Sequence, residues 1–138
     1  MTDDTQSLDQ AQNILERECR DGRVSLTPRE QDTFHVYRFL CEFENGGLSG
    51  LLYNLSPDFV DLQSLSSVVR RLGRADLATL FDSAFDIVSR GPTDFRGTWS
   101  GWLSVTDSEQ RIPNLDERIS ACYEILWDDL PILTQQEI

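Results

Sequence analysis

The chain has 138 residues, and 24 acidic against 12 basic side chains give it a net charge of −12 at pH 7. This excess disfavours direct binding to nucleic acid and to anionic membranes, which are polyanions, and favours partners with positively charged surfaces. No apolar stretch approaches the roughly 18–20 residues that cross a bilayer, and Met1-Thr2-Asp3-Asp4 lacks the basic region of a signal peptide. We therefore expect a cytoplasmic protein, with acidity kept for solubility alone as the alternative explanation of the charge.

The charges are unevenly distributed along the chain. Residues 105–138 hold eight acids and two arginines, whereas residues 48–104 hold six acids and five arginines. Every basic residue is arginine, and the planar guanidinium group forms bidentate pairs with carboxylates. Some arginines are therefore predicted to form internal ion pairs.

Metal and cofactor chemistry find little support in the sequence. Cys19, Cys41 and Cys122 are far apart, form no CxxC pair and fall among apolar helical neighbours, so we expect reduced cysteines in the core. His35 is the single histidine, which argues against a zinc site. The sequence predicts no metal and no cofactor.

The first half of the chain is predicted to be helical. A narrow apolar stripe indicates a helix over 7–20 with Ser7 as its N-cap. Thr27-Pro28-Arg29-Glu30 forms a capping box with proline at the first helical position, and it opens a helix that runs to about Glu44. This helix is apolar on two sides, as in an element packed between neighbours, and we expect His35 to be a packed residue on it.

Glycine and proline divide the rest of the chain into further helices. Asn45-Gly46-Gly47 is predicted to end the long helix, and a short helix over 48–53 follows, closed by Asn54. Helices over 56–72 and 75–89 come next, separated by Gly73.

The last third combines an irregular stretch with a final helix. Four glycines and prolines predict an irregular connection over 90–107, in which Trp99 and Trp102 either fold back onto the core or form an exposed patch for a partner or a second copy of the chain. A second capping box, Asn114 with Glu117, predicts a last helix over 114–128 that ends before Pro131. The fold class is therefore all-α: a single compact domain over 1–138 with about six helices.

Acidic side chains gather on the polar sides of the last two predicted helices. On one continuous helix, Glu117, Glu124 and Asp128 share the face opposite the apolar residues. Carboxylates one turn apart disfavour a helix by a few tenths of a kcal/mol, and their spacing resembles the charge spacing of DNA. The residues predicted to form a partner-binding acidic face are Asp82, Asp86, Glu117, Glu124, Asp128 and Asp129.

A short segment carries a family resemblance. Phe43 to Asn54, with its Asn-Gly-Gly and Tyr-Asn pair, resembles the core motif of a bacterial family of DNA-mimic proteins, and the similarity extends over about residues 30–130. The chain departs from the family pattern at Leu48, Gly50 and Leu51-Leu52. The resemblance implies a small, acidic, all-helical protein that binds a helix-turn-helix repressor through its acidic face. The motif residues, to which we assign structural roles, are Asn45, Gly46, Gly47, Tyr53 and Asn54.

Three functions remain open at this point. The first is a DNA mimic that occupies the DNA-binding surface of a basic protein such as a transcription regulator. The second is an immunity or antitoxin-like inhibitor of a basic toxin or nuclease. The third, an enzyme, is disfavoured because Glu42 and Glu44 face different ways and no nucleophile, phosphate-binding or zinc motif is present.

Overall fold

Seven α-helices and one 3-10 turn make up residues 4–135, the part of the chain that this computed structural model describes. They confirm the predicted all-α domain, with seven helices rather than about six. Met1-Thr2-Asp3, part of the segment on which the signal-peptide expectation rests, lies outside the described residues. The elements are α1 (Asp4–Asp21), η1 (Arg23–Ser25), α2 (Pro28–Leu55), α3 (Val60–Arg71), α4 (Ala75–Val88), α5 (Trp99–Thr106), α6 (Arg111–Ser120) and α7 (Ile125–Thr134).

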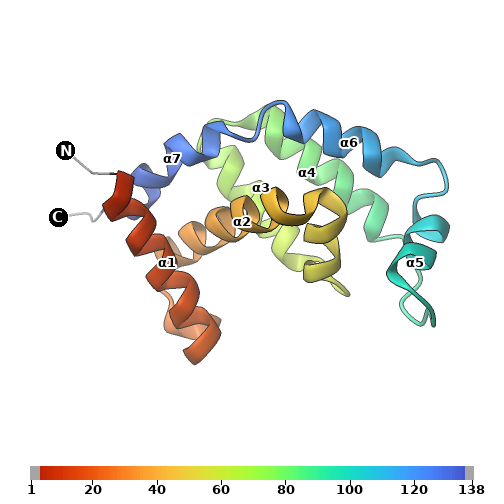
Figure 1. Cartoon of the computed structure of the whole chain (residues 1–138), viewed down its shortest axis with the longest axis horizontal. Coiled ribbons are helices and arrows are strands. Elements are labelled where there is room, and N and C mark those ends of the chain that lie inside the picture. Colours follow the sequence, from red (N-terminus) through yellow and green to blue (C-terminus); the bar gives the residue numbers. More distant parts are fainter. Residues whose placement is uncertain (1–3, 136–138) are drawn as a thin grey trace.

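Helix α2 lies at the centre of the domain, as its two-sided apolar pattern predicts (Figure 1). It packs against α1, α3, α6 and α7, while α4 packs against α3 and α6. Gly73, at φ 84°, turns the chain between α3 and α4; a positive φ is strained for other residues. Both described ends of the chain lie at one end of the domain, and α5 lies at the other.

The core is built on phenylalanine and leucine side chains from α2, α3 and α4. Phe39 stacks on Phe43, with ring centroids 5.2 Å apart, and meets Phe81 edge-on at 4.9 Å. Leu48 and Leu52 of α2 and Leu62 of α3 are fully buried beside them. Burial of such side chains contributes roughly 1.5–3 kcal/mol each, so the packing around α2 fixes the positions of the surface residues.

The start of α2 is as predicted, but its end is not. The Thr27 hydroxyl accepts from the Glu30 N–H while the Glu30 carboxylate accepts from the Thr27 N–H, which completes the capping box. The helix does not end at Asn45-Gly46-Gly47; it continues to Leu55 with a kink at Gly47 (φ 66°, ψ −167°). The Asp116 carboxylate accepts from the Leu48 N–H at 3.4 Å, so α6 holds the kink. Neither Asn45 nor Asn54 caps a helix end, because both lie inside α2.

Two other predicted helix starts are wrong. Helix α1 already includes Asp4, and Ser7 is a buried residue inside it rather than its N-cap. Helix α3 starts at Val60 instead of Ser56, because Phe59 adopts a left-handed conformation (φ 60°) after the cis Ser56–Pro57 peptide bond.

The chain after residue 90 contains more helix than predicted. Residues 99–106 form α5, where the Thr98 hydroxyl accepts from the Gly101 N–H and caps the helix. The predicted final helix over 114–128 is two helices, α6 and α7, separated at residues 121–124. Helix α6 begins at Arg111 because the Asp107 carboxylate accepts from the backbone N–H groups of Arg111 and Ile112. Pro131 lies inside α7 rather than after the last helix.

The expectation of core cysteines is also wrong. Cys19, Cys41 and Cys122 are free and exposed; the first two lie on the outer sides of α1 and α2, and Cys122 lies in the turn between α6 and α7. His35, in contrast, is buried as expected, in edge contact with Phe34. Within residues 4–135 no helix is long and apolar enough to cross a membrane.

Candidate partner-binding surface

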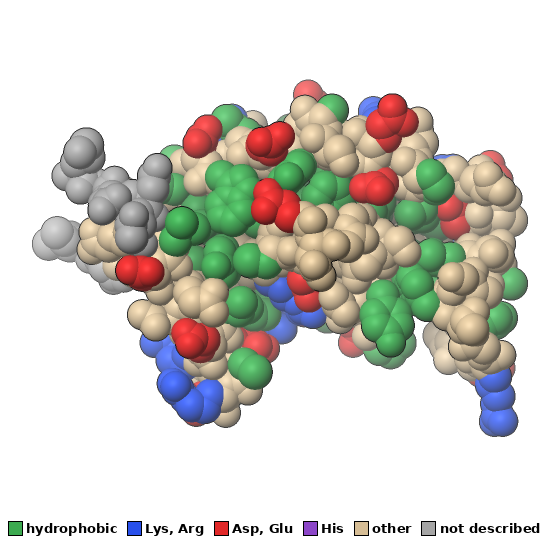
Figure 2. Space-filling view, in the orientation of Figure 1, with side chains coloured by type: hydrophobic (Ala, Val, Ile, Leu, Met, Phe, Trp, Pro, Cys, Tyr) green, Lys and Arg blue, Asp and Glu red, His purple; other side chains and the backbone are tan. Residues whose placement is uncertain are grey.

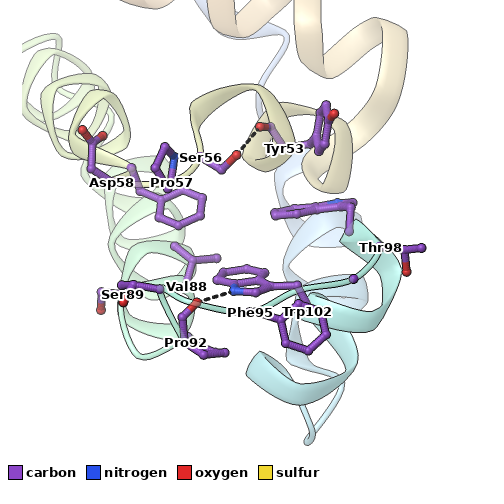
Figure 3. A pocket seen from close by; sticks show the side chains of 15 residues that line it. Tyr53, Ser56, Pro57, Asp58, Val88, Ser89, Pro92, Phe95, Thr98 and Trp102 are labelled. Atoms are coloured by element: carbon purple, nitrogen blue, oxygen red, sulfur yellow. Dashed lines mark hydrogen bonds between the residues drawn. The ribbon is translucent and has the colours of Figure 1, made fainter.

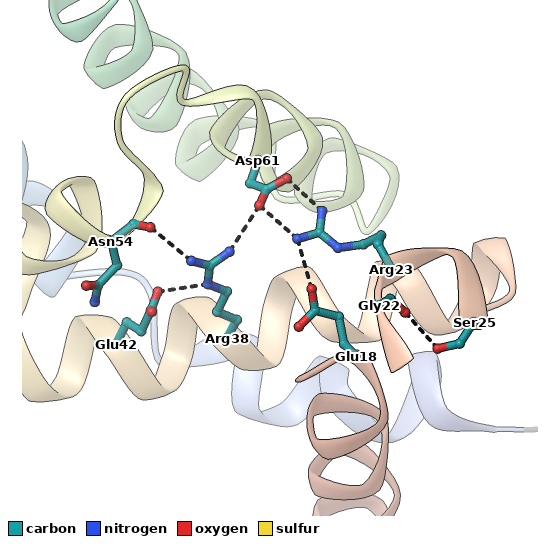
Figure 4. Close-up of polar contacts among 8 residues, drawn as sticks. All are labelled: Glu18, Gly22, Arg23, Ser25, Arg38, Glu42, Asn54 and Asp61. Carbon is teal, nitrogen blue, oxygen red and sulfur yellow. Dashed lines mark hydrogen bonds and ion pairs between the residues drawn. The ribbon is translucent and has the colours of Figure 1, made fainter. Parts of the chain in front are cut away.

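The carboxylates of this protein fall into two groups, those that pair with arginines and those that do not. The paired group centres on Asp61 in α3, which receives two guanidinium groups (Figure 4). Arg23 donates to its Oδ1 at 2.8 Å and its Oδ2 at 3.1 Å, and Arg38 donates to Oδ2 at 3.0 Å. These bonds join η1, α2 and α3, which confirms the prediction of internal bidentate arginine pairs.

Further groups complete this network. The Glu18 carboxylate accepts from Arg23 and the Glu42 carboxylate from Arg38, and the Arg23 guanidinium lies 4.5 Å from the centre of the Phe34 ring. Burial acts to raise the pKa of Asp61, but hydrogen bonding and charge from Arg23 outweigh it and hold that pKa below its usual value. The network around Asp61 therefore fastens η1, α2 and α3 together.

Three of the predicted partner-binding acids belong to this paired group. Asp129 is only 3% exposed and accepts two hydrogen bonds from Arg74, at 2.8 and 2.9 Å, so it does not lie on a surface. Asp82 and Asp86 are exposed, but Arg70 and Arg90 pair with them. The charges of all three are thus compensated within the protein.

The other three predicted acids are exposed and, among the described residues, form no ion pair. These are Glu117 on α6, Glu124 at the start of α7 and Asp128 within α7. The prediction that they share one continuous helix is wrong, because a turn at residues 121–124 separates α6 from α7. They remain on the outside because the apolar residues of both helices, Ile119 and Leu126 among them, point into the core.

Glu44 in α2 joins this unpaired group, and sequence reasoning missed it. Its Oε2 accepts from the Tyr123 hydroxyl at 2.9 Å and from the Trp127 indole N–H at 2.8 Å, while the residue stays exposed. The two donors fix the position of the carboxylate without neutralising its charge. No sequence signal could have shown this, because the donors lie about eighty residues further along the chain.

Burial and the unpaired acids raise the pKa values of two neighbouring side chains. Burial, then the hydrogen bond and charge of Glu44, and then the charge of Glu124 raise the pKa of Tyr123. Burial and then the Asp76 carboxylate raise the pKa of Cys122. We define the acidic surface by its exposed carboxylates around the α6–α7 junction: Glu44, Asp76, Glu117, Glu124 and Asp128.

The space-filling view shows where the acidic and basic side chains lie on one face of the protein. In Figure 2 acidic side chains are spread along the upper edge formed by α6 and α7, with hydrophobic surface between them. Most of the visible basic groups lie on the lower side, at the outer end of α1, below the middle of the molecule and at the lower right, and a small part of one is visible on the upper edge.

The tryptophans of the predicted aromatic patch lie elsewhere. Trp99 and Trp102 are partly buried against the core, which confirms that they fold back onto it. Their indole N–H groups donate to the Ser49 hydroxyl and to the Pro92 carbonyl. In the described part of the chain no group of three histidine, cysteine or acidic side chains is placed to hold a metal ion.

The described residues form an all-helical domain that carries a group of exposed, unpaired carboxylates around the α6–α7 junction. A family model described as DMP19-like protein matches residues 24–133, so the chain belongs to the DMP19-like family, as its resemblance to DNA-mimic proteins predicted. No curated protein and no solved structure matches the chain.

Proposed function

We propose that this protein is a DNA mimic whose acidic surface occupies the DNA-binding site of a basic protein such as a transcription regulator. The observation that carries the proposal is the grouping of exposed carboxylates without arginine partners around the α6–α7 junction. Other acids are neutralised by arginines, and unpaired acids elsewhere, such as Asp9 and Glu109, lie outside this group. Membership of a family of DNA mimics supports the same function.

The physical basis is competition between two polyanions for one positive surface. DNA presents about one charge per 3.4 Å along each strand, and the acidic surface presents carboxylates held on rigid helices. Glu44 is the best-fixed of these, since Tyr123 and Trp127 hold one of its oxygens and leave the other for an incoming guanidinium or ammonium group. Preorganised charge costs less to align on binding than charge on mobile side chains.

The proposal is tested with two variants of equal net charge. The surface quadruple variant is E44Q, E117Q, E124Q and D128N. The control quadruple variant removes exposed, unpaired acids elsewhere: D9N, E16Q, D94N and E109Q. Asp76 is left unchanged because it stabilises the first turn of α4.

Each protein is used as bait in bacterial lysate, with and without excess duplex DNA. We expect the wild type and the control quadruple variant to capture the same DNA-binding protein, DNA to displace it, and the surface quadruple variant to capture none. Capture by both variants alike would contradict the role of the acidic surface. A partner that DNA does not displace would favour the immunity or antitoxin-like function instead.

A further inference from the structure

An aromatic cavity of about 420 Å³ lies at the other end of the molecule from α1, away from the acidic surface. It opens between the end of α2, the start of α3, the end of α4 and the 89–98 segment that leads into α5 (Figure 3). Its size falls within the roughly 300–1,000 Å³ of pockets that bind small molecules. The aromatic residues that line it are Tyr53, Phe59, Phe95, Trp99 and Trp102.

Four of these rings form one connected cluster. Trp102 stacks on Trp99 with ring centroids 5.1 Å apart and an interplanar angle of 12°, and Phe59 stacks on Trp102 at 5.7 Å. Tyr53 meets Trp99 edge-on at 5.5 Å. The ring of Tyr53 and that of Trp102 lie on opposite sides of the cavity. A ligand ring that enters therefore finds aromatic partners on several sides, in the stacked and edge-on arrangements that aromatic pairs prefer.

The side chains that line the cavity disfavour one class of ligand. The lining contains no arginine and no histidine, and its one carboxylate is Asp58. An anionic ligand would lose its hydration without gaining a cationic partner, which is costly, and it would also be repelled by the net charge of −12. Nucleotides, phosphates and carboxylates are thus disfavoured.

The polar groups of the lining are largely engaged with the protein itself. The Ser56 hydroxyl donates to the Tyr53 carbonyl and the Ser89 hydroxyl to the Asp86 carbonyl. Both indole N–H groups are also engaged, and Thr98 caps α5. Few groups remain to satisfy a polar ligand, so the lining favours an apolar one.

One wall of the cavity is able to adjust. Over 93–97, within the described chain, no residue donates a backbone hydrogen bond, and Phe95, on this segment, is 37% exposed. Segments with few backbone hydrogen bonds open at low free energy, which gives a ligand a route past Phe95.

We propose that this cavity binds a small, flat aromatic molecule that carries no negative charge. The inference rests on the cavity alone and does not depend on the proposed DNA mimicry. It assigns Phe95 as the outer wall of the site, and Trp99 and Trp102 as its aromatic floor.

The test uses two probes that share one ring system, indole and indole-3-acetate. Binding to the full ¹⁵N-labelled chain is followed through the three tryptophan indole N–H signals, and a W127F variant assigns the signal that belongs to the acidic surface. We expect indole to shift the Trp99 and Trp102 signals saturably and to leave the Trp127 signal in place. Indole-3-acetate should bind at least about tenfold more weakly.

A matched pair of variants locates the site. F95A removes one wall of the cavity and should weaken indole binding at least about threefold. V105A removes an exposed side chain of α5 that does not line the cavity and should leave binding unchanged. An indole concentration of about 10 mM is high enough to detect binding with a millimolar dissociation constant. The proposal is overturned if no saturable shift occurs up to this concentration, or if indole-3-acetate binds as tightly as indole. It is also overturned if F95A and V105A have the same effect on indole binding.

Discussion

The network around Asp61 and the acidic surface around the α6–α7 junction use the same residue type for different purposes. Asp61 lies between Arg23 and Arg38 and joins three elements of the fold. Glu44, Glu124 and Asp128 have no arginine partner among the described residues and face solvent. Net charge is therefore a poor guide to function, because only the acids that no arginine neutralises are available to a positively charged partner.

The two regions also differ in what their acids contribute to stability. Part-buried carboxylates that accept several charged hydrogen bonds are costly to remove, because their partners are left unsatisfied. Exposed surface charges contribute little to folding. Removal of acids from the first region should therefore affect folding, and removal from the second should affect binding.

The largest expected effect is on partner binding by the surface quadruple variant. Its affinity for the captured partner should fall at least about a hundredfold near 100 mM salt, because four phosphate-like contacts are lost. Isothermal titration calorimetry measures this, and wild-type affinity should itself fall steeply between about 50 and 200 mM salt. A loss of equal size in the control quadruple variant would show that total charge, and not position, controls binding.

The next largest effect is the loss of folding stability when the network around Asp61 is disrupted. D61N leaves Arg23 and Arg38 facing an uncharged amide, and should lower the free energy of unfolding by about 2 kcal/mol. Urea denaturation with an unchanged slope measures the loss, and partner affinity should change less than about threefold. If D61N abolished binding while leaving stability intact, the assignment of the two regions would be reversed.

A smaller effect should appear in the pH dependence of stability. Because the pKa of Asp61 is held below its unfolded value, its stabilising contribution is complete above about pH 4 and is lost as the pH falls through the folded pKa. The difference in unfolding free energy between wild type and D61N should therefore shrink as the pH falls from about 5 to 2.5. Denaturation at constant ionic strength measures it, and a difference that stays constant over this range would rule out a lowered pKa.

The smallest effect should come from a single change, E44Q. Glutamine keeps an acceptor for Tyr123 and Trp127 but removes the charge, so stability should change by less than about 0.5 kcal/mol. Partner affinity should fall several-fold, and the slope of log affinity against log salt should decrease by about one. An unchanged slope would place Glu44 outside the interface.

Local sequence signals predicted the elements better than their boundaries. The Thr27–Glu30 capping box and the apolar period over 75–89 depend on residues within a few positions, and both were correct. The kink at Gly47 was mistaken for a helix end because Asp116, which holds it, is distant in the sequence. The start of α6 likewise depends on Asp107, which belongs to no capping box.

The candidate site was predictable only in part, for the same reason. Periodicity placed Glu117, Glu124 and Asp128 outside, where the structure has them. Periodicity could not show that Asp129 would be buried and paired with Arg74. Nor could it show that Tyr123 and Trp127 would hold the Glu44 carboxylate in place. The partners of Asp129 and Glu44 are far away in the chain, whereas Asp86 is paired by Arg90 only four residues further on, a spacing that the sequence does show.

The most direct test of this account is the hydrogen-exchange footprint of the captured DNA-binding partner on this protein. We expect slower exchange in the complex over residues 117–128 and around Glu44, with no change over α1 and α3. Protection confined to α1 and α3, or to the segment that lines the aromatic cavity, would contradict it.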